Sequence, residues 1–214
     1  MAAQSFKQRV AQTAIEQAKV YERVFMKYEF LLCSCAFHNR TYYIISAHSD
    51  NYRHLVGVNT TISAVNFFEK CLSGTLTEDD FDFTKRGQSE KEVKGAVRDK
   101  LIALPQFLTR MEKPLLAEED FEKNRVHCIF ATTDQSATVG FAAADRSKPM
   151  TLLRGDRLHP LNSAPVDLIL RRQAGTELFD EIVCGNETMV AKYMGEIQKL
   201  LSDDLKPKRA YSMV

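Results

Sequence analysis

Four stretches of the chain carry apolar side chains at every third or fourth position, which is the spacing of an amphipathic helix. They cover residues 5–28, 62–73, 90–111 and 187–202. Ser5 is placed to cap the first helix, and Ser89 and Glu92 form a capping box before the third. Pro105 lies inside the third stretch, so we expect a kink or a break near it.

Short runs rich in β-branched and aromatic residues predict the strands. Residues 29–36 and 41–47 are expected to form a hairpin, and Gly57 is expected to take a special backbone angle in a turn within residues 50–58. Residues 112–124 are expected to form a surface connection. The remaining predicted strands are 126–132, 138–144, 150–154, 166–171 and 180–184.

The order of these elements predicts the fold class. Strands come in hairpins rather than in alternation with long helices, which favours an α+β fold with an antiparallel sheet packed against helices. No repeat or low-complexity linker divides the chain. We therefore expect one domain over residues 1–214, with a hairpin-and-helix part at 28–110 and a strand-rich part at 125–202.

Composition narrows the setting. The 214 residues are 44% hydrophobic and 27% charged with a net charge of +1, so an RNA-binding role would need a local basic patch. No apolar run of 18 residues is present, so no membrane span is expected, and Met1–Arg9 does not resemble a signal peptide. The odd number of cysteines, five, favours reduced thiols in the cytoplasm over a disulfide framework.

Metal binding is the weaker interpretation of the cysteines and histidines. Cys33 and Cys35 share one face of a predicted strand, with His38 nearby. A zinc site usually needs a second pair of ligands, and His127 with Cys128 is the sole candidate in the sequence. These two residues are adjacent in a predicted strand, so their side chains would face opposite sides and could not bind one metal ion together. We therefore expect buried thiols and no metal. Phosphate-binding glycine loops, nucleophile elbows and metalloprotease helix motifs are absent from the sequence.

His54 is the residue best suited to proton transfer. A histidine titrates near neutral pH, Arg53 beside it could meet a phosphate, and Gly57 would let the backbone approach a ligand. The alternative is a histidine that only bonds to the main chain at the end of an element, and from the residues alone this alternative is favoured.

A basic stretch offers phosphate contacts, with ordinary solvated strand edges as the favoured alternative. It holds six basic residues against three acidic ones, a local net charge of +3. The basic residues are Arg146, Lys148, Arg154, Arg157, Arg171 and Arg172, and the acidic ones are Asp145, Asp156 and Asp167.

Three consecutive segments resemble a known family. They are Tyr28-Glu29-Phe30 through Tyr42-Tyr43-Ile44-Ile45, then Tyr52-Arg53-His54-Leu55-Val56-Gly57, then Phe67-Phe68-Glu69-Lys70-Cys71-Leu72. Their order resembles the phage-associated nuclease-like families grouped with barnase, EndoU, the tRNA-cleaving colicins and RelE. One of these families carries an aromatic-x-His-Leu-Thr-Gly signature. Val56 stands at the hydroxyl position of that signature, so no hydroxyl role is carried over.

The resemblance covers residues 28–110 and implies both a fold and an activity. The implied fold has helices packed on a four- or five-stranded antiparallel sheet. The implied activity is metal-independent RNA cleavage without a cofactor. Members of the group lie in phages and integrative elements, which implies the cytoplasm of a bacterial host.

Site roles follow from this hypothesis. His54 would act as base or acid, with Arg53 and one or more of Arg154, Arg157 and Arg171 stabilising phosphate charge. His127 or His159 would supply the second proton-transfer group, and Tyr52 would stack on a base. Of these residues, His54 alone comes from the matched motif, and the others are inferred from residue type.

Two other interpretations stay open at this stage. One is a catalytically silent binding protein of phage origin that engages a host or defence protein, which the near-neutral charge favours. The other is an oligomeric structural or assembly protein that self-associates through the helix at residues 5–28. Because a fold does not fix a function, the groups that surround His54 in the structure must distinguish these interpretations.

Overall fold

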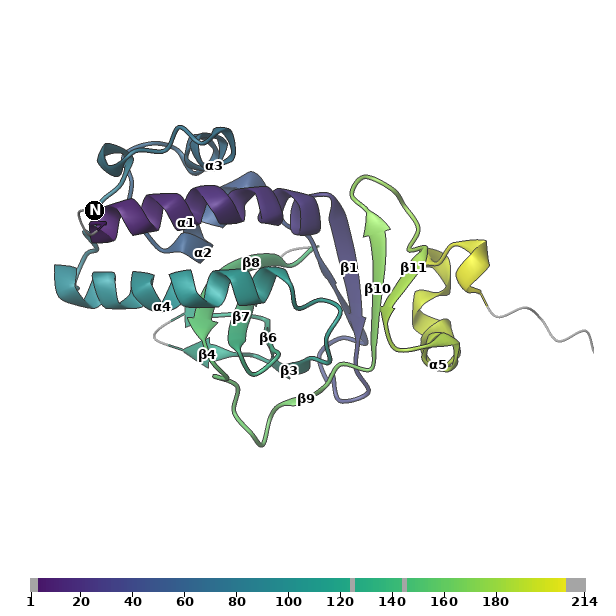
Figure 1. Ribbon diagram of the computed structural model, residues 1–214. Helices are drawn as coiled ribbons and strands as arrows, with labels where there is room; N and C mark the ends of the chain where they lie inside the picture. The colour runs from purple at the N-terminus through teal and green to yellow at the C-terminus, as the bar shows by residue number, and fades with distance from the viewer. Residues whose placement is uncertain (1–3, 124–125, 144–145, 207–214) are drawn as a thin grey trace, which may run out of the picture.

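The computed structural model describes residues 4–123, 126–143 and 146–206 (Figure 1). The helices are α1 (Phe6–Tyr21), α2 (Ser49–Val56), α3 (Ala64–Ser73), α4 (Glu90–Leu108) and α5 (Glu187–Ile197). A π-helix, Glu22–Met26, continues α1, and 3-10 turns lie at Glu78–Asp80, Gln198–Leu200 and Asp203–Leu205. The strands are β1 (Tyr28–Cys33), β2 (Tyr42–Ile45), β3 (Leu116–Glu119), β4 (Glu122–Lys123), β5 (Val126–His127), β6 (Phe130–Thr133), β7 (Ala137–Ala142), β8 (Lys148–Arg154), β9 (Ala164–Pro165), β10 (Leu168–Gln173) and β11 (Glu181–Cys184).

The strands form two main antiparallel sheets and a small hairpin. One sheet has the order β11-β10-β1-β2, the other has the order β8-β7-β6-β3-β9, and β4 pairs with β5. A parallel bridge between Ile45 and Ser147 connects the two main sheets. The prediction of an α+β fold with antiparallel strands is confirmed, with two sheets in place of one.

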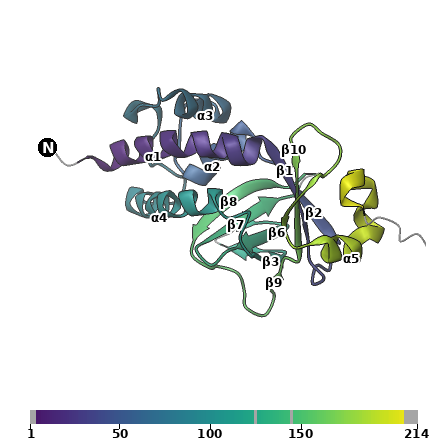
Figure 2. The same ribbon diagram turned by 45° about the vertical axis from the view of Figure 1, so that its right-hand side comes forward.

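The helices divide between two sides of the four-stranded sheet. Helices α1, α3 and α4 lie together on one side, and α5 covers the opposite face (Figures 1 and 2). The main core lies between the first group of helices and the sheets, and a second apolar cluster, which includes Leu31 and Tyr193, lies under α5. Among the described residues, no helix is both long enough and apolar enough to span a membrane.

The N-terminal helix ends earlier than its apolar pattern suggests. Ser5 caps α1 as predicted, its hydroxyl accepting from the main-chain N–H of Gln8. The helix widens into the π-turn, and Tyr28, expected on the helix, opens β1. The apolar stripe of α1 is buried in the core, with Val10, Ala14 and Ala18 fully covered, so it does not offer an apolar face for self-association.

The segment expected as a turn at 50–58 is a helix, α2. Asn51, Tyr52, Leu55 and Val56 form its buried face, a periodicity of three to four that is too short to stand out in the sequence. Gly57 ends α2 with φ at +86°, which confirms its special backbone angle.

Helix α4 begins at the predicted capping box. The hydroxyl of Ser89 accepts from the N–H of Glu92, and the Glu92 carboxylate accepts from the N–H of Ser89. The helix passes through Pro105 and ends at Leu108, one turn later. Pro105 therefore lies in the last turn of α4 and does not break it.

The strand-rich half follows the prediction with three additional strands. Strands β3 and β4 lie within residues 112–124, expected as a surface connection. Strand β3 pairs with β6 and the short β9, and β4 pairs with β5. The predicted strand 126–132 is divided into β5 and β6. The last residue of the predicted strand 138–144, Asp145 of the basic stretch, and the chain after Lys206 lie outside the described residues.

Candidate functional site

A cleft of about 850 Å³ opens beside the C-terminal end of α2. Its walls come from the end of α2, the loop before α4, the first half of α4, and strands β5 and β8. The lining residues are Arg53, His54, Gly57, Val58, Asn59, Phe83, Thr84, Lys85, Arg86, Gln88, Glu90, Val93, Ala96, Lys100, Val126, Met150 and Thr151.

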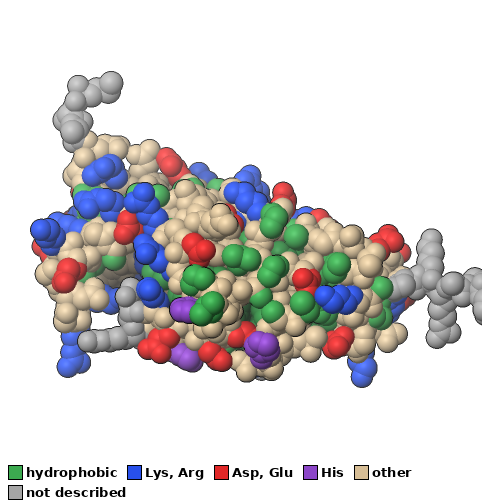
Figure 3. Space-filling view, turned by 90° about the horizontal axis from the view of Figure 1, so that it is seen from below, with side chains coloured by type: hydrophobic (Ala, Val, Ile, Leu, Met, Phe, Trp, Pro, Cys, Tyr) green, Lys and Arg blue, Asp and Glu red, His purple; other side chains and the backbone are tan. Residues whose placement is uncertain are grey.

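The cleft gathers positive charge in a chain that is nearly neutral overall. Its described lining holds four cations, Arg53, Lys85, Arg86 and Lys100, against one carboxylate, Glu90. Glu90 also pairs with Lys94 on the outer side of α4, at 2.6 Å between Nζ and Oε1. Lys and Arg side chains crowd the left-hand end of the face in Figure 3, the end at which α4 begins. The cleft is therefore suited to an anionic ligand.

His54 lies in the last turn of α2, with an exposed side chain that lines the cleft. Partial burial and the positive charges of Arg53, Lys100 and Lys85 lower its pKa from the ordinary value, and Asp50 opposes the shift. The imidazole is therefore neutral at pH 7, the form that accepts a proton.

Lys100 lies across the C-terminal end of α2. Its ammonium donates a hydrogen bond to the main-chain carbonyl of His54. Desolvation and the nearby charge of Lys85 lower the pKa of Lys100 from 10.5 to about 8. Gly57 makes this placement possible, because a Cβ at position 57 would lie 2.5 Å from Cδ of Lys100.

The loop that carries Lys85 and Arg86 is held by a polar turn. Asn59 and Asp82 exchange two main-chain hydrogen bonds, at 3.1 and 2.9 Å. The Asp82 carboxylate accepts from the N–H of Thr84 and from Nδ2 of Asn59, at 2.7 and 3.0 Å. Hydrogen bonds from Thr84 are the main cause that lowers the pKa of Asp82. These hydrogen bonds therefore fix the loop from which the Lys85 and Arg86 side chains extend.

The structure places Tyr52 away from the cleft. Its side chain is fully buried, and its hydroxyl donates to the carbonyl of Ala14 at 2.7 Å. Its ring packs against Tyr21 and Phe68, with centroids at 5.1 and 5.3 Å. The base-stacking role expected of Tyr52 is not supported, because its ring has no exposed face.

Three of the arginines expected to bind phosphate also lie outside the lining of the cleft. Arg171 pairs with Glu181 and stacks on Tyr28. Arg154 pairs with Asp99 at 3.5 Å, and Arg157 donates to the carbonyl of Arg154. The stretch at residues 145–172 is basic in sequence, but the fold spreads its cations over several ion pairs instead of one patch.

The other histidines do not join His54. Val126 lines the cleft, and His127 follows it on β5, so the His127 side chain points to the opposite side of the strand. His159 lies on a loop that does not line the cleft, and its main-chain N–H donates a hydrogen bond to the Glu118 carboxylate. In the described part of the chain, no group of three or more His, Cys, Asp or Glu residues is arranged to hold a metal ion.

Of the residues that line the cleft, sequence reasoning found Arg53, His54 and Gly57 and missed Lys85, Arg86 and Lys100. Lys85 and Arg86 had a usable signal, since adjacent cations beside Gly87 precede a capping box. Lys100 had none, because it is one of several lysines on the polar side of a long helix.

Comparison with known proteins decides the family. The family model PBECR4, described as phage-Barnase-EndoU-ColicinE5/D-RelE like nuclease4, matches residues 15–153, more than half of the chain. The chain belongs to this nuclease-like family. No curated protein and no solved structure gives a significant match.

The PBECR4 match also separates two groups of residues. Every residue that lines the cleft, from Arg53 to Thr151, lies inside the matched range. Arg154, Arg157 and Arg171 lie beyond its end. The part of the chain that the family shares is therefore the part that builds the cleft.

Proposed function

We propose that this PBECR4 protein is an endoribonuclease whose active site is the cleft beside α2, and that it cleaves RNA without a metal ion. One observation carries the proposal. A histidine with a lowered pKa lies in a cleft whose described lining holds four cations and one carboxylate, all within the range shared with the nuclease-like family. Proton transfer and phosphate charge stabilisation are the two functions that metal-free RNA cleavage needs.

His54 is the general base in this proposal. Its neutral imidazole takes the proton from the ribose 2′-hydroxyl, and the 2′-oxygen attacks the adjacent phosphorus. A 2′,3′-cyclic phosphate forms as the bond to the 5′-oxygen breaks. Proton transfer of this kind contributes roughly a hundredfold to ten-thousandfold in rate.

Lys100 is the general acid, in place of His127 or His159. With a pKa of about 8 it is mainly protonated at pH 7 and can give its proton to the departing 5′-oxygen. Its position against the main chain of His54 keeps acid and base in one cleft. Arg53, Lys85 and Arg86 stabilise the extra negative charge of the phosphorane.

The biological setting belongs to the same proposal. The family description names phage nucleases, which supports an origin in a phage or another mobile element. An enzyme that cuts RNA would act as a toxin-like effector in the cytoplasm of a bacterial host. Its partner would be RNA, and no cofactor is needed.

The chemistry of the products tests the proposal. Purified protein is incubated in EDTA with an RNA oligonucleotide and with the same sequence carrying a single 2′-deoxy nucleotide at the cleavage position. We expect cleavage of the first substrate to leave a 2′,3′-cyclic phosphate, and the 2′-deoxy position to resist. Cleavage at the 2′-deoxy position, or activity that requires an added divalent cation, would overturn the mechanism.

A further inference from the structure

The cleft wall continues into a row of cations on the outer surface. Phe83 lines the cleft, and its ring centroid lies 5.2 Å from that of Phe6 on α1. The ammonium of Lys94 lies 5.3 Å from the centroid of the Phe83 ring. The aromatic residue that bounds the cleft therefore also supports a cation outside it.

Three more cations rest on the same group of rings. The guanidinium groups of Arg9 and Arg98 lie 5.7 and 5.3 Å from the centroid of Phe6. Lys7 lies 5.4 Å from Phe81, whose ring is an edge-on neighbour of Phe83. We call Lys7, Arg9, Lys94 and Arg98 the basic ridge. It joins the N-terminal half of α1 to α4, and both helices begin at the end of the molecule where Lys and Arg gather (Figures 1 and 3).

The two arginines of the basic ridge keep their charge available. Both are exposed, and neither is within ion-pair distance of a described carboxylate. A guanidinium that stacks on an aromatic ring is held in place while its N–H groups still point outward. Lys94 and Arg98 lie one turn apart on α4, about 6 Å along the axis, so they can contact successive phosphates. This pattern is typical of a surface that meets an external polyanion.

The size of the cleft indicates which polyanion fits. A volume of about 850 Å³ is within the range of pockets that enclose a drug-sized ligand, and one or two unpaired nucleotides are of that size. A cleft of this volume favours an unpaired strand over a base-paired duplex. An RNA strand that places its scissile phosphate in the cleft must leave it over a neighbouring surface.

We propose that the basic ridge binds the phosphate backbone of single-stranded RNA that extends beyond the scissile bond. This inference rests on the proposed function of the cleft. The aromatic rings hold the cations, and the cations guide the strand from Phe83 toward α1. The enzyme would then prefer long unpaired substrates over dinucleotides, although the chemistry is confined to the cleft.

A matched pair of variants tests the basic ridge. Arg9→Gln with Arg98→Gln removes two ridge charges, and Lys19→Gln with Arg23→Gln removes two exposed charges, one near the end of α1 and one on the π-helix that follows it. Each pair is combined with His54→Ala, so that binding is measured without cleavage. Binding of a fluorescent single-stranded RNA of about 12 nucleotides is followed by anisotropy over a range of salt concentrations.

We expect the ridge pair to reduce the slope of log K against log salt by about 1.4, since each lost phosphate contact removes about 0.7 for a single strand. The control pair should leave the slope unchanged. In the active background, the ridge pair should slow cleavage of the long RNA and leave dinucleotide cleavage unchanged.

An equal reduction of the salt slope in both pairs of variants, or no reduction in the ridge pair, would overturn the role of the basic ridge and leave the proposed function of the cleft intact. If the His54→Ala protein with an intact ridge binds no RNA, the proposed function falls with it. Thermal unfolding by circular dichroism confirms that each variant is folded.

Discussion

The side-chain ammonium of Lys100 donates a hydrogen bond to the main-chain carbonyl of His54. The two residues are 46 positions apart in the chain and come from α4 and α2. A cation at the C-terminal end of a helix is favourable, because the last carbonyls have no partner within the helix. The contact brings two groups with lowered pKa values into one cleft.

A substitution at Gly57 tests the contact between Lys100 and the main chain of His54. Gly57→Ala would force a side chain into a left-handed conformation and place its Cβ against Lys100. We expect a loss of about 1–2 kcal/mol in the free energy of unfolding, with a large fall in activity. Gly74→Ala at the end of α3 has the same backbone strain, with no atom within 4 Å of the new Cβ. That control should lose similar stability in urea and keep its kcat/KM.

The dependence of kcat/KM on pH should be bell-shaped. Activity requires neutral His54, whose pKa is lowered, so the rate should rise with pH through a limb below 6.5. It also requires protonated Lys100, whose pKa is about 8, so the rate should fall above that value. Stopped-time assays from about pH 5 to 10 would show both limbs. A rate that still rises above pH 9 would contradict the role of Lys100 as the acid.

Lys100→Met separates a functional role from a structural one. Desolvation makes the folded protein bind the Lys100 proton more weakly than the unfolded chain does, so this charge lowers stability at pH 7. We expect the variant to be as stable as the wild type or more stable, by up to about 3 kcal/mol, and to lose most of its cleavage rate. Urea unfolding and single-turnover cleavage give the two values. A variant that is less stable and equally active would show that Lys100 acts only as a helix cap.

The pattern of the sequence was sufficient for elements with a strong local signal. The Ser5 cap, the Ser89 and Glu92 box, and the hairpin of β1 and β2 follow from neighbouring residues, and each is found. Helix α2 was not predicted, because its eight residues bury one narrow face against the core.

The site was harder to predict than the fold because tertiary packing assembles it. Arginine and tyrosine are residue types that bind phosphate and stack on bases, and Arg171 and Tyr52 were predicted to do so. In the structure Arg171 pairs with Glu181, and Tyr52 is enclosed in the core. Lys100 has no local signal of its importance. Its role follows from its contact with the main chain of His54 and from Gly57, which lies 43 positions earlier in the chain.

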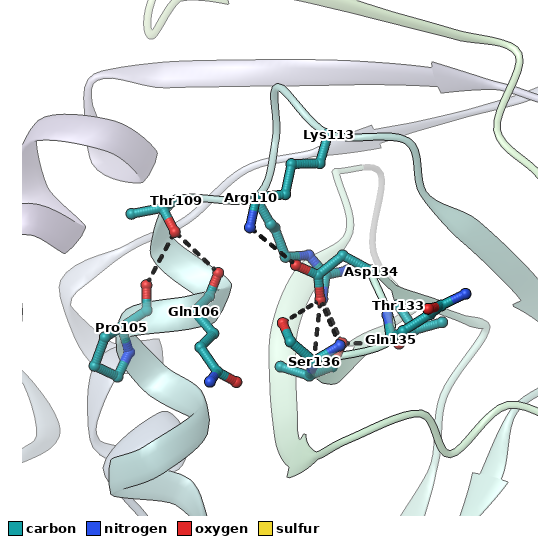
Figure 4. Close-up of polar contacts among 10 residues, drawn as sticks. Pro105, Gln106, Thr109, Arg110, Lys113, Thr133, Asp134, Gln135 and Ser136 are labelled. Carbon is teal, nitrogen blue, oxygen red and sulfur yellow. Dashed lines mark hydrogen bonds and ion pairs between the residues drawn. The ribbon is translucent and has the colours of Figure 1, made fainter.

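Arg110 links the end of α4 to the turn between β6 and β7. Its guanidinium is fully buried and donates to the carbonyl of Ala137 and to the hydroxyl of Thr132. Asp134 lies nearby in the same turn and accepts from Ser136 at 2.6 Å (Figure 4). Burial lowers the pKa of Arg110 to about 10, and the charge of Asp134 opposes the shift.

Arg110→Met should therefore be strongly destabilising. It leaves a buried carbonyl and a buried hydroxyl without the guanidinium donor and removes a favourable charge near Asp134, at a cost of about 3 kcal/mol in the free energy of unfolding. Arg23→Met, at an exposed position on the π-helix, should change stability by less than about 0.5 kcal/mol. Equal urea midpoints for the two variants would show that the Arg110 contacts do not stabilise the fold.

Proton transfer by His54 in the cleft requires that loss of its imidazole slow RNA cleavage, and this is measured by single-turnover cleavage in EDTA. Wild type, His54→Ala and His127→Ala are compared, since His127 is exposed and does not line the cleft. We expect wild type and His127→Ala to cleave at the same rate, and His54→Ala to be slower by about a hundredfold or more while its circular dichroism spectrum is unchanged. A folded His54→Ala protein that cleaves as fast as wild type would contradict a catalytic role for His54.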